Sequence, residues 1–324
     1  MSAPPQAYRA PFWLRGGHAQ TIYPALLLGG ERPRLRRERW DTPDGDFIDL
    51  DFLDAARAGA PCVALFHGLE GGASSHYARA LMRTLALAGW SGVVVHFRGC
   101  SGEANRLPRA YHSGDAAEIA WILERLAQTP RPLLAAGVSL GGNALLKWLG
   151  EAGSGAAHIS AAAAVSAPLD LAASGAALEQ GMSPIYTRVF LATLRKKSLD
   201  KLARFPGLLD RDRILGARSL RDFDNAVTAP LHGYRDTDDY WTRASSKDGL
   251  ANVCLPTLVL NARNDPFLPG RHLPRQDEVS PMVRLEQPEE GGHVGFARGA
   301  FPGNIDWLPQ RLLAFFREHL PALR

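Results

Sequence analysis

Short, continuous apolar runs alternate with helix-like stretches over most of the chain. The apolar runs lie at 62–66, 92–95, 133–136, 161–165 and 257–260, with a further strand expected at 282–285. They are too short for helices and too apolar for half-exposed strands, so they indicate parallel strands buried on both faces. Helical patterns connect them at 77–88, 115–126, 143–149 and 307–320. This alternation predicts right-handed crossovers and a doubly wound, mostly parallel sheet.

Two segments depart from the alternation. Residues 35–40 and 47–53 flank a turn-rich stretch, and the period-2 pattern at 47–52 predicts an N-terminal antiparallel hairpin. From 172 to 251 the strand pattern stops, and two basic, helix-like segments at 184–205 and 240–245 take over. We therefore predict an α/β core formed by residues 1–171 and 252–324, with a helical cap inserted at 172–251.

The composition narrows the class of protein. A chain of 324 residues can form one large α/β domain that carries an insertion. Hydrophobic residues make up 46% and charged residues 22%, which allows a sizeable core and excludes wholesale disorder. The formal net charge of +4 is mild, and basic residues are scattered among acidic ones. This distribution argues against a nucleic-acid partner.

The sequence shows no pattern typical of export or of membrane insertion. Residues 1–13 have no apolar core of the kind found in a signal peptide, and no stretch approaches the roughly 20 apolar residues that span a bilayer. Cys62, Cys100 and Cys254 have no CxxC spacing and fit structural thiols in a reducing compartment. We expect a cytoplasmic protein with no integral membrane segment, no disulfide framework and no zinc site.

Ser139 has the sequence context of an activated nucleophile. It is the central residue of Gly-Val-Ser-Leu-Gly at 137–141, directly after the apolar run 133–136 and before the helical pattern 143–149. A serine between a buried strand and a helix lies in a tight, strained turn, and the flanking glycines allow close approach of neighbouring backbone. The helix N-terminus beneath it favours negative charge on an attacked carbonyl oxygen. This pattern predicts a nucleophile elbow.

A serine hydroxyl needs a base and an orienting carboxylate. Asp265 follows the strand at 257–260, and His293 lies between paired glycines and Val-Gly-Phe ahead of the last helix. Asp170, just past 161–165, is a rival acid. We favour Asp265 because a loop that follows a strand is the usual place of the acid, and the order serine, aspartate, histidine is that of α/β hydrolases.

Two backbone N–H groups are expected to form an oxyanion hole. Leu140 follows the nucleophile, and Leu69 lies in the loop 67–72 after the strand at 62–66, where Gly68 lets the chain turn its amides inward. For His67 we favour a role in holding this loop by hydrogen bonds over a catalytic role.

Several further polar residues follow buried strands. His96 and Arg98 are expected to build the floor of the site, and residues 111–115 are expected to cap the next helix. No histidine pair has ligand spacing on one helix, so we predict no metal and no cofactor. The basic helix around 187–205 has two interpretations: a solvated cap face, which we favour, or transient contact with a lipid surface.

The combined motifs resemble those of the YheT-like α/β hydrolases. In the core they are Phe-His-Gly-Leu-Glu-Gly at 66–71, Ser-His-Tyr at 75–77, His-Phe-Arg-Gly-Cys-Ser-Gly-Glu at 96–103, Tyr-His-Ser-Gly at 111–114 and Ser-Leu-Gly-Gly-Asn at 139–143. In the N-terminal segment and the cap they are Pro-Phe-Trp-Leu-Arg at 11–15, with His18, Gln20, Thr21 and Ile22 after it, and Phe-Asp at 223–224, Thr-Ala-Pro at 228–230 and Tyr-Trp at 240–241. The similarity extends over nearly the whole chain.

The resemblance implies an α/β-hydrolase fold with its charge relay on Ser139, Asp265 and His293. The family includes membrane-anchored eukaryotic relatives described as monoacylglycerol lipases, acetylesterases and medium-chain acyltransferases. Three functional hypotheses follow. The first is a serine esterase that cleaves short- to medium-chain acyl esters or monoacylglycerol-like lipids through an acyl-enzyme. The second is an acyltransferase that forms esters from the same acyl-enzyme, and the third is a non-catalytic protein that binds a lipid or a partner.

Overall fold

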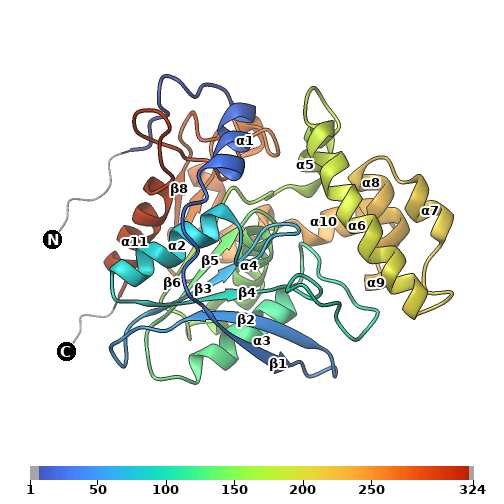
Figure 1. Ribbon diagram of the computed structural model, residues 1–324, viewed down its shortest axis with the longest axis horizontal. Helices are drawn as coiled ribbons and strands as arrows, with labels where there is room; N and C mark the ends of the chain where they lie inside the picture. The colour runs from blue at the N-terminus through green and yellow to red at the C-terminus, as the bar shows by residue number, and fades with distance from the viewer. Residues whose placement is uncertain (1–6, 321–324) are drawn as a thin grey trace.

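The apolar runs become strands of one eight-stranded sheet in the computed structural model, which describes residues 7–320 (Figure 1). The strands are β1 (Arg36–Asp41), β2 (Phe47–Leu53), β3 (Cys62–Phe66), β4 (Ser91–Val95), β5 (Leu133–Val138), β6 (Ala161–Val165), β7 (Thr257–Leu260) and β8 (Val283–Glu286). Their order in the sheet is β1-β2-β4-β3-β5-β6-β7-β8. β1 and β2 pair antiparallel, β2 is antiparallel to β4, and the remaining neighbours are parallel. The predicted fold class, with its N-terminal hairpin, is confirmed.

Helices cover both faces of the sheet because alternate side chains of each central strand point to opposite faces. On β3, Cys62, Ala64 and Phe66 pack with helices α3 (Ala116–Ala127) and α4 (Leu140–Ala152). Val63 and Leu65 pack on the other face with α2 (His76–Leu87) and α11 (Trp307–Glu318). The carboxyl ends of the parallel strands are left for a site, as in other doubly wound sheets.

The hairpin strand β2 is more buried than its period-2 pattern suggests. Asp49 and Asp51 point away from the apolar positions, yet both are buried. Arg39 covers Asp49 through a contact of 2.8 Å, and Arg37 covers Asp51 through one of 2.7 Å. An alternating pattern normally means that the polar side chains face solvent. Here the two aspartates of β2 form ion pairs with arginines of the neighbouring strand β1 instead.

The N-terminal helix α1 (Gly17–Leu27) has no counterpart among the predicted elements. Its buried positions are Gln20, Thr21 and Pro24, whereas Leu26 and Leu27 are exposed. A helix that buries polar residues gives no apolar stripe, so its sequence lacks the period that identifies amphipathic helices. Residues 1–6, part of the stretch examined for a signal peptide, lie outside the described residues.

Between β6 and β7 the chain forms a helical segment, coloured yellow-green to orange in Figure 1. Its elements are α5 (Leu171–Leu178), α6 (Pro184–Arg204), α7 (Arg211–Gly216), α8 (Leu220–Phe223), the π-helical turn η2 (Asp224–Thr228), α9 (Ala229–His232), α10 (Thr237–Ala244) and the 3-10 helix η3 (Lys247–Asn252). Further 3-10 turns are η1 (Gly153–Ala156), η4 (Gly270–His272) and η5 (Gln276–Glu278).

This helical segment has its own small core. Leu191 of α6 packs with Ile214, Phe223 and Val227. The two predicted helical patterns correspond to α6 and α10, but the short helices between them were not predicted. Helices of four to six residues are too short to show a hydrophobic period, and capping side chains such as Asp210 and Ser219 stabilise their first turns.

Candidate active site

Ser139 occupies the sharp turn between β5 and α4, with φ 52° and ψ −122°. A residue with a side chain is strained in this left-handed region. A Cβ on Gly137 would lie 2.5 Å from the carbonyl oxygen of Gly141, and a Cβ on Gly141 would lie 2.5 Å from that of His67. No side chain fits at either glycine. The two glycines therefore have the close-approach role that their spacing predicted.

Asp265 and His293 converge on this serine from two other loops. The Nε2 atom of His293 lies 3.0 Å from Oγ of Ser139, and its Nδ1 atom lies 2.9 Å from Oδ2 of Asp265. The Asp265 carboxylate is fully buried, and its Oδ1 accepts the Phe267 N–H at 2.8 Å. Because Nδ1 donates its proton to the carboxylate, Nε2 is left as the acceptor for the serine proton.

Asp170, the rival acid, has a different role. It is the N-cap residue of α5, and its Oδ1 accepts the Ala173 N–H at 2.9 Å. An oxygen acceptor at this position satisfies one of the free N–H groups of the first helical turn. Asp265 is thus the acid that hydrogen bonds to His293.

Helix α1 holds the loop that carries His293. Thr21 Oγ1 accepts the backbone N–H of His293 at 2.8 Å, and Gln20 Oε1 accepts that of Gly291 at 2.8 Å. The same Gln20 oxygen accepts the side-chain amide of Asn264 at 2.9 Å, next to Asp265. Motif reasoning from chemistry missed these residues. Gln20 and Thr21 appeared only through the family resemblance, which was the one signal that could have found them.

The glycines around His293 are explained by the same helix. A Cβ on Gly292 would lie 2.7 Å from the carbonyl oxygen of Gly17, and one on Gly295 would overlap that of Gln20. These glycines allow the backbone of α1 to approach the histidine loop. Close approach of backbone therefore explains why these positions are glycine.

We expect Thr21→Val to lower kcat about tenfold. The substitution keeps the side-chain shape but leaves the buried N–H of His293 without its acceptor, at a typical cost of about 1–3 kcal/mol. The loss should displace the imidazole relative to Ser139. Turnover of p-nitrophenyl acetate and the thermal unfolding midpoint measure the two effects. Thr242→Val, at an exposed position of α10, is the matched control. A lower midpoint with unchanged kcat would limit Thr21 to a structural role.

The loop after β3 directs its amides by hydrogen bonds. The Gly68 carbonyl oxygen accepts His67 Nδ1–H at 2.7 Å and the Gly71 N–H at 2.9 Å. Since a peptide group is planar and trans, the Leu69 N–H in the same peptide points the opposite way. A Cβ on Gly68 would lie 3.0 Å from Cβ of Ser139, which places this loop against that serine.

Leu140 is the first residue of α4, where backbone N–H groups have no intrahelical acceptor. The Leu140 N–H thus lies at the start of α4, and the Leu69 N–H lies in the loop after β3. Both segments lie next to Ser139. His67 also accepts the Phe97 N–H at Nε2, 3.1 Å away, and burial lowers its pKa to about 3. The neutral His67 ring makes a hydrogen bond through each of its nitrogens, which confirms its predicted role in holding the loop.

Backbone strain is concentrated around these residues. Among the described residues, the non-glycine residues with positive φ are Glu70, Ser139, Ser166, Val294 and Phe296. Glu70 lies in the loop after β3, Val294 and Phe296 follow His293, and Ser166 Oγ accepts the Val294 N–H at 3.0 Å. Strained conformations of this kind persist where surrounding contacts over-determine them, and they cluster at functional sites.

The other polar residues singled out from the sequence have mixed outcomes. Arg98 does line the cavity beside Ser139, where it binds Glu118 at 2.6 Å and Asp44 at 2.8 Å. His96 instead pairs with Asp51 at 2.8 Å and is not among the lining residues. The side chain of Asp115, at the N-cap position of α3, binds Arg109 at 2.5 Å rather than the helix N-terminus. The predicted cap at 111–115 is therefore right in its position, but the Asp115 side chain accepts no hydrogen bond from the helix because it binds the Arg109 guanidinium.

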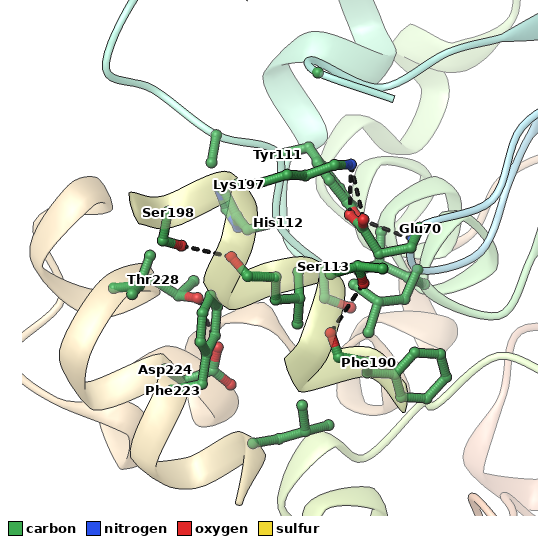
Figure 2. A pocket seen from close by; sticks show the side chains of 18 of the residues that line it. Glu70, Tyr111, His112, Ser113, Phe190, Lys197, Ser198, Phe223, Asp224 and Thr228 are labelled. Carbon is green, nitrogen blue, oxygen red and sulfur yellow. Dashed lines mark hydrogen bonds and ion pairs between the residues drawn. The ribbon is translucent and has the colours of Figure 1, made fainter. Parts of the chain in front are cut away.

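A cavity of about 560 Å³ lies over Ser139, between the strand ends and the helical segment. Its wall near Ser139 includes Leu69, Leu140 and Phe267, and the Phe267 ring stacks on that of His293 with centroids 4.0 Å apart. The helical segment contributes a mixed wall, partly visible in Figure 2, that includes Phe190, Leu194, Lys197, Phe223 and Asp224. The cavity thus combines apolar surface with a few polar groups, as small-molecule sites usually do.

Asp224 is a half-buried acid in the wall of this cavity. Its carboxylate accepts hydrogen bonds from Thr228 at 2.6 Å and from the Trp241 indole at 2.8 Å, and burial raises its pKa from 3.8 to about 6. The folded state therefore holds this proton more tightly than the unfolded state. Its contribution to stability is present below about pH 4 and is lost as the pH rises through about 6.

We expect Asp224→Asn to remove this pH dependence. Two pKa units correspond to about 3 kcal/mol, so the free energy of unfolding of the variant, relative to wild type, should rise by about that amount between pH 4 and pH 7. Urea unfolding at both pH values measures the change. The exposed Asp248→Asn serves as the control. A constant difference between variant and wild type would show that Asp224 does not titrate in this range.

Comparison with known proteins places this geometry in a family. The family model for the alpha/beta hydrolase fold matches residues 61–300. The chain belongs to the α/β hydrolases. YheT of Escherichia coli strain K12 is 38% identical to this α/β hydrolase, over 94% of this chain and 91% of YheT. Phospholipase ABHD3 of Mus musculus is 31% identical, over 98% of this chain and 79% of the phospholipase. The chain is thus of the esterase and lipase type within the family.

A solved structure supports the fold independently. The esterase Pf2001 of Pyrococcus furiosus aligns with this α/β hydrolase at a TM-score of 0.56 and 16% identity, covering 89% of this chain and 92% of the esterase. Within residues 7–320, no helix is long and apolar enough to cross a membrane, and no group of three or more His, Cys, Asp or Glu side chains is arranged to hold a metal ion.

Proposed function

We propose that this α/β hydrolase is a serine esterase that cleaves carboxylic esters through an acyl-enzyme on Ser139. The observation that carries the proposal is the continuous hydrogen-bond relay from Ser139 Oγ through His293 to Asp265, at 3.0 and 2.9 Å. Nucleophile, base and orienting acid within hydrogen-bond reach are what acyl transfer to a serine needs. The named activity of the phospholipase relative agrees with an ester substrate.

The proposed reaction has two halves. Ser139 Oγ attacks the ester carbonyl carbon while His293 Nε2 takes its proton, and the Leu69 and Leu140 N–H groups hydrogen bond to the developing oxyanion. His293 then gives the proton to the leaving alcohol oxygen as the C–O bond breaks. Water attacks the acyl-enzyme in the same manner and releases the carboxylic acid. Asp265 keeps Nδ1 protonated and stabilises the imidazolium in both halves.

We further propose that residues 172–251 act as a cap on a core formed by residues 1–171 and 252–324. The cavity wall supports this division, because one side comes from the loops at the strand ends and the other from α5, α6, η2 and α10. Such a cap would select the acyl group and limit water in the site. We propose short- to medium-chain acyl esters and monoacylglycerol-like lipids as the substrates.

A fluorophosphonate probe and an ester series test the proposal together. Covalent labelling mapped to Ser139 by peptide mass spectrometry, with hydrolysis of p-nitrophenyl esters between acetate and palmitate, is the expected result. A folded protein that is neither labelled nor active would overturn the esterase proposal and favour a binding role. Ester formation in the presence of ethanol, in excess of hydrolysis, would instead identify an acyltransferase, since only the second nucleophile differs.

A further inference from the structure

Glu70 occupies an unusual position beside the proposed oxyanion hole. The Gly71 N–H donates to the Gly68 carbonyl at 2.9 Å and closes a turn in which Leu69 and Glu70 are the central residues. Glu70 has φ 55°, at the turn position that usually requires glycine. A glutamate is strained there, so its contacts must hold the turn in this form. Contacts that hold Glu70 therefore also fix the orientation of the neighbouring peptide group, which carries the Leu69 N–H.

A half-buried tyrosine binds Glu70 at two points. Tyr111 Oη accepts the Glu70 backbone N–H at 2.9 Å and donates to Glu70 Oε1 at 2.8 Å. Its ring stacks parallel to that of Phe97, with centroids 5.3 Å apart. Burial raises the pKa of Tyr111 well above 10, so its hydroxyl stays protonated and can donate. The phenol therefore couples the side chain of Glu70 to the strained backbone of the turn.

A further partner of this carboxylate comes from the cap. Lys197 of α6 places Nζ 2.8 Å from both carboxylate oxygens of Glu70 and 3.5 Å from Sγ of Cys100 (Figure 2). The Glu70 side chain is only 12% exposed, whereas Lys197 is 41% exposed. Charge on a largely buried carboxylate depends strongly on such a partner. Lys197 of the cap thus contacts the loop that carries the proposed oxyanion-hole amide of Leu69.

Other contacts attach α6 to the core without Lys197. Lys201 Nζ donates to Asn105 Oδ1 at 3.0 Å and to the Leu107 carbonyl at 2.8 Å. Arg204 donates to the Asn105 carbonyl at 2.7 Å. Removing the Lys197 ammonium should therefore leave the cap attached. The contact between Lys197 and Glu70 can be tested separately from cap docking.

We infer that Lys197 and Glu70 are positioning residues that couple the cap to the oxyanion hole. With α6 in place, the ion pair and Tyr111 hold the turn that aims the Leu69 amide at the reacting carbonyl. Leu194 and Phe190, one and two turns before Lys197 on α6, line the same cavity, so a substrate that packs against them contacts the helix that carries Lys197. The inference rests on the proposed esterase function, and it explains how the Leu69 amide of the oxyanion hole is held in position.

The test compares an ester with the matching thionoester, in which sulfur replaces the carbonyl oxygen. Sulfur is a poor hydrogen-bond acceptor, so the thionoester gains little from the hole. Lys197→Met should lower kcat for the ester about tenfold, a part of the 10²–10³ that one oxyanion donor is worth, with KM changed less than about twofold. The rate for the thionoester should stay at the wild-type value, so the preference for the ester falls about tenfold.

Matched variants separate positioning from packing. Arg188→Met removes a charge from an exposed position of the same helix and should leave both rates unchanged. Glu70→Gln should reproduce the loss of preference, and adding Lys197→Met to it should cause no further loss, because the two residues act through one contact. Lys197→Arg should restore most of the preference.

The outcomes that contradict the inference are distinct from those that contradict the esterase proposal. An active wild-type enzyme whose ester preference is unchanged by Lys197→Met would overturn the coupling alone. An equal fall in both rates would mean general loss of packing and would also overturn it. A wild-type protein that hydrolyses neither substrate and takes no label at Ser139 would overturn the esterase function itself.

Discussion

Replacing Ser139 with alanine is expected to lower kcat for p-nitrophenyl acetate by about a millionfold. Loss of the nucleophile in a serine relay typically has this effect, because no other group can form the acyl-enzyme. The substitution removes only Oγ, which hydrogen bonds to His293, so the fold should survive. Hydrolysis at saturating substrate and the intact mass after fluorophosphonate treatment measure the result.

The control for this variant is Ser154→Ala, at an exposed position of the 3-10 turn η1. It should be labelled and should turn over substrate as the wild type does. If Ser139→Ala kept wild-type turnover, another residue would have to be the nucleophile, and the proposed mechanism would be wrong.

Replacing Asp265 with asparagine is expected to lower kcat about 10⁴-fold. The side chain keeps its shape, but its amide can donate to His293 Nδ1, which favours the tautomer with the proton on Nε2. That tautomer cannot accept the proton of Ser139, and a substitution of this type in a serine relay costs about 10⁴ in kcat. The pre-steady-state rate of acylation with p-nitrophenyl acetate measures the effect directly.

Asp170→Asn is the matched control, because it makes the same chemical change in the acid that the sequence left as a rival. Asparagine is a good N-cap residue, so α5 should keep its first turn and activity should stay near wild type. A large loss in Asp170→Asn with little loss in Asp265→Asn would exchange the roles assigned to these two acids.

The central sheet was predictable because its signals are local. A buried parallel strand must be a short apolar run, and β3, β6 and β7 begin and end at the predicted residues. The turn at Ser139 was also predictable, since steric contact at Gly137 and Gly141 leaves glycine as the only choice. Where one backbone contact determines the residue type, the sequence carries the information.

The parts that escaped prediction depend on contacts between distant segments. Gln20 and Thr21 are buried polar residues of α1, and their partners at 291 and 293 lie more than 270 residues away. The pair of Lys197 and Glu70 spans 127 residues and joins an ordinary basic helix to an ordinary loop. Neither side of such a contact shows an unusual local pattern, so only the folded chain reveals it.

The attachment of α1 to the histidine loop has a consequence for the protein as it is synthesised. Thr21 is made early and His293 late, 272 residues apart, and the hydrogen bond between them closes the site. A nascent chain that has already folded β5 and exposed Ser139 still has no base beside that serine. Under the proposed mechanism, a chain therefore becomes active only after its C-terminal segment has been synthesised and has folded against α1.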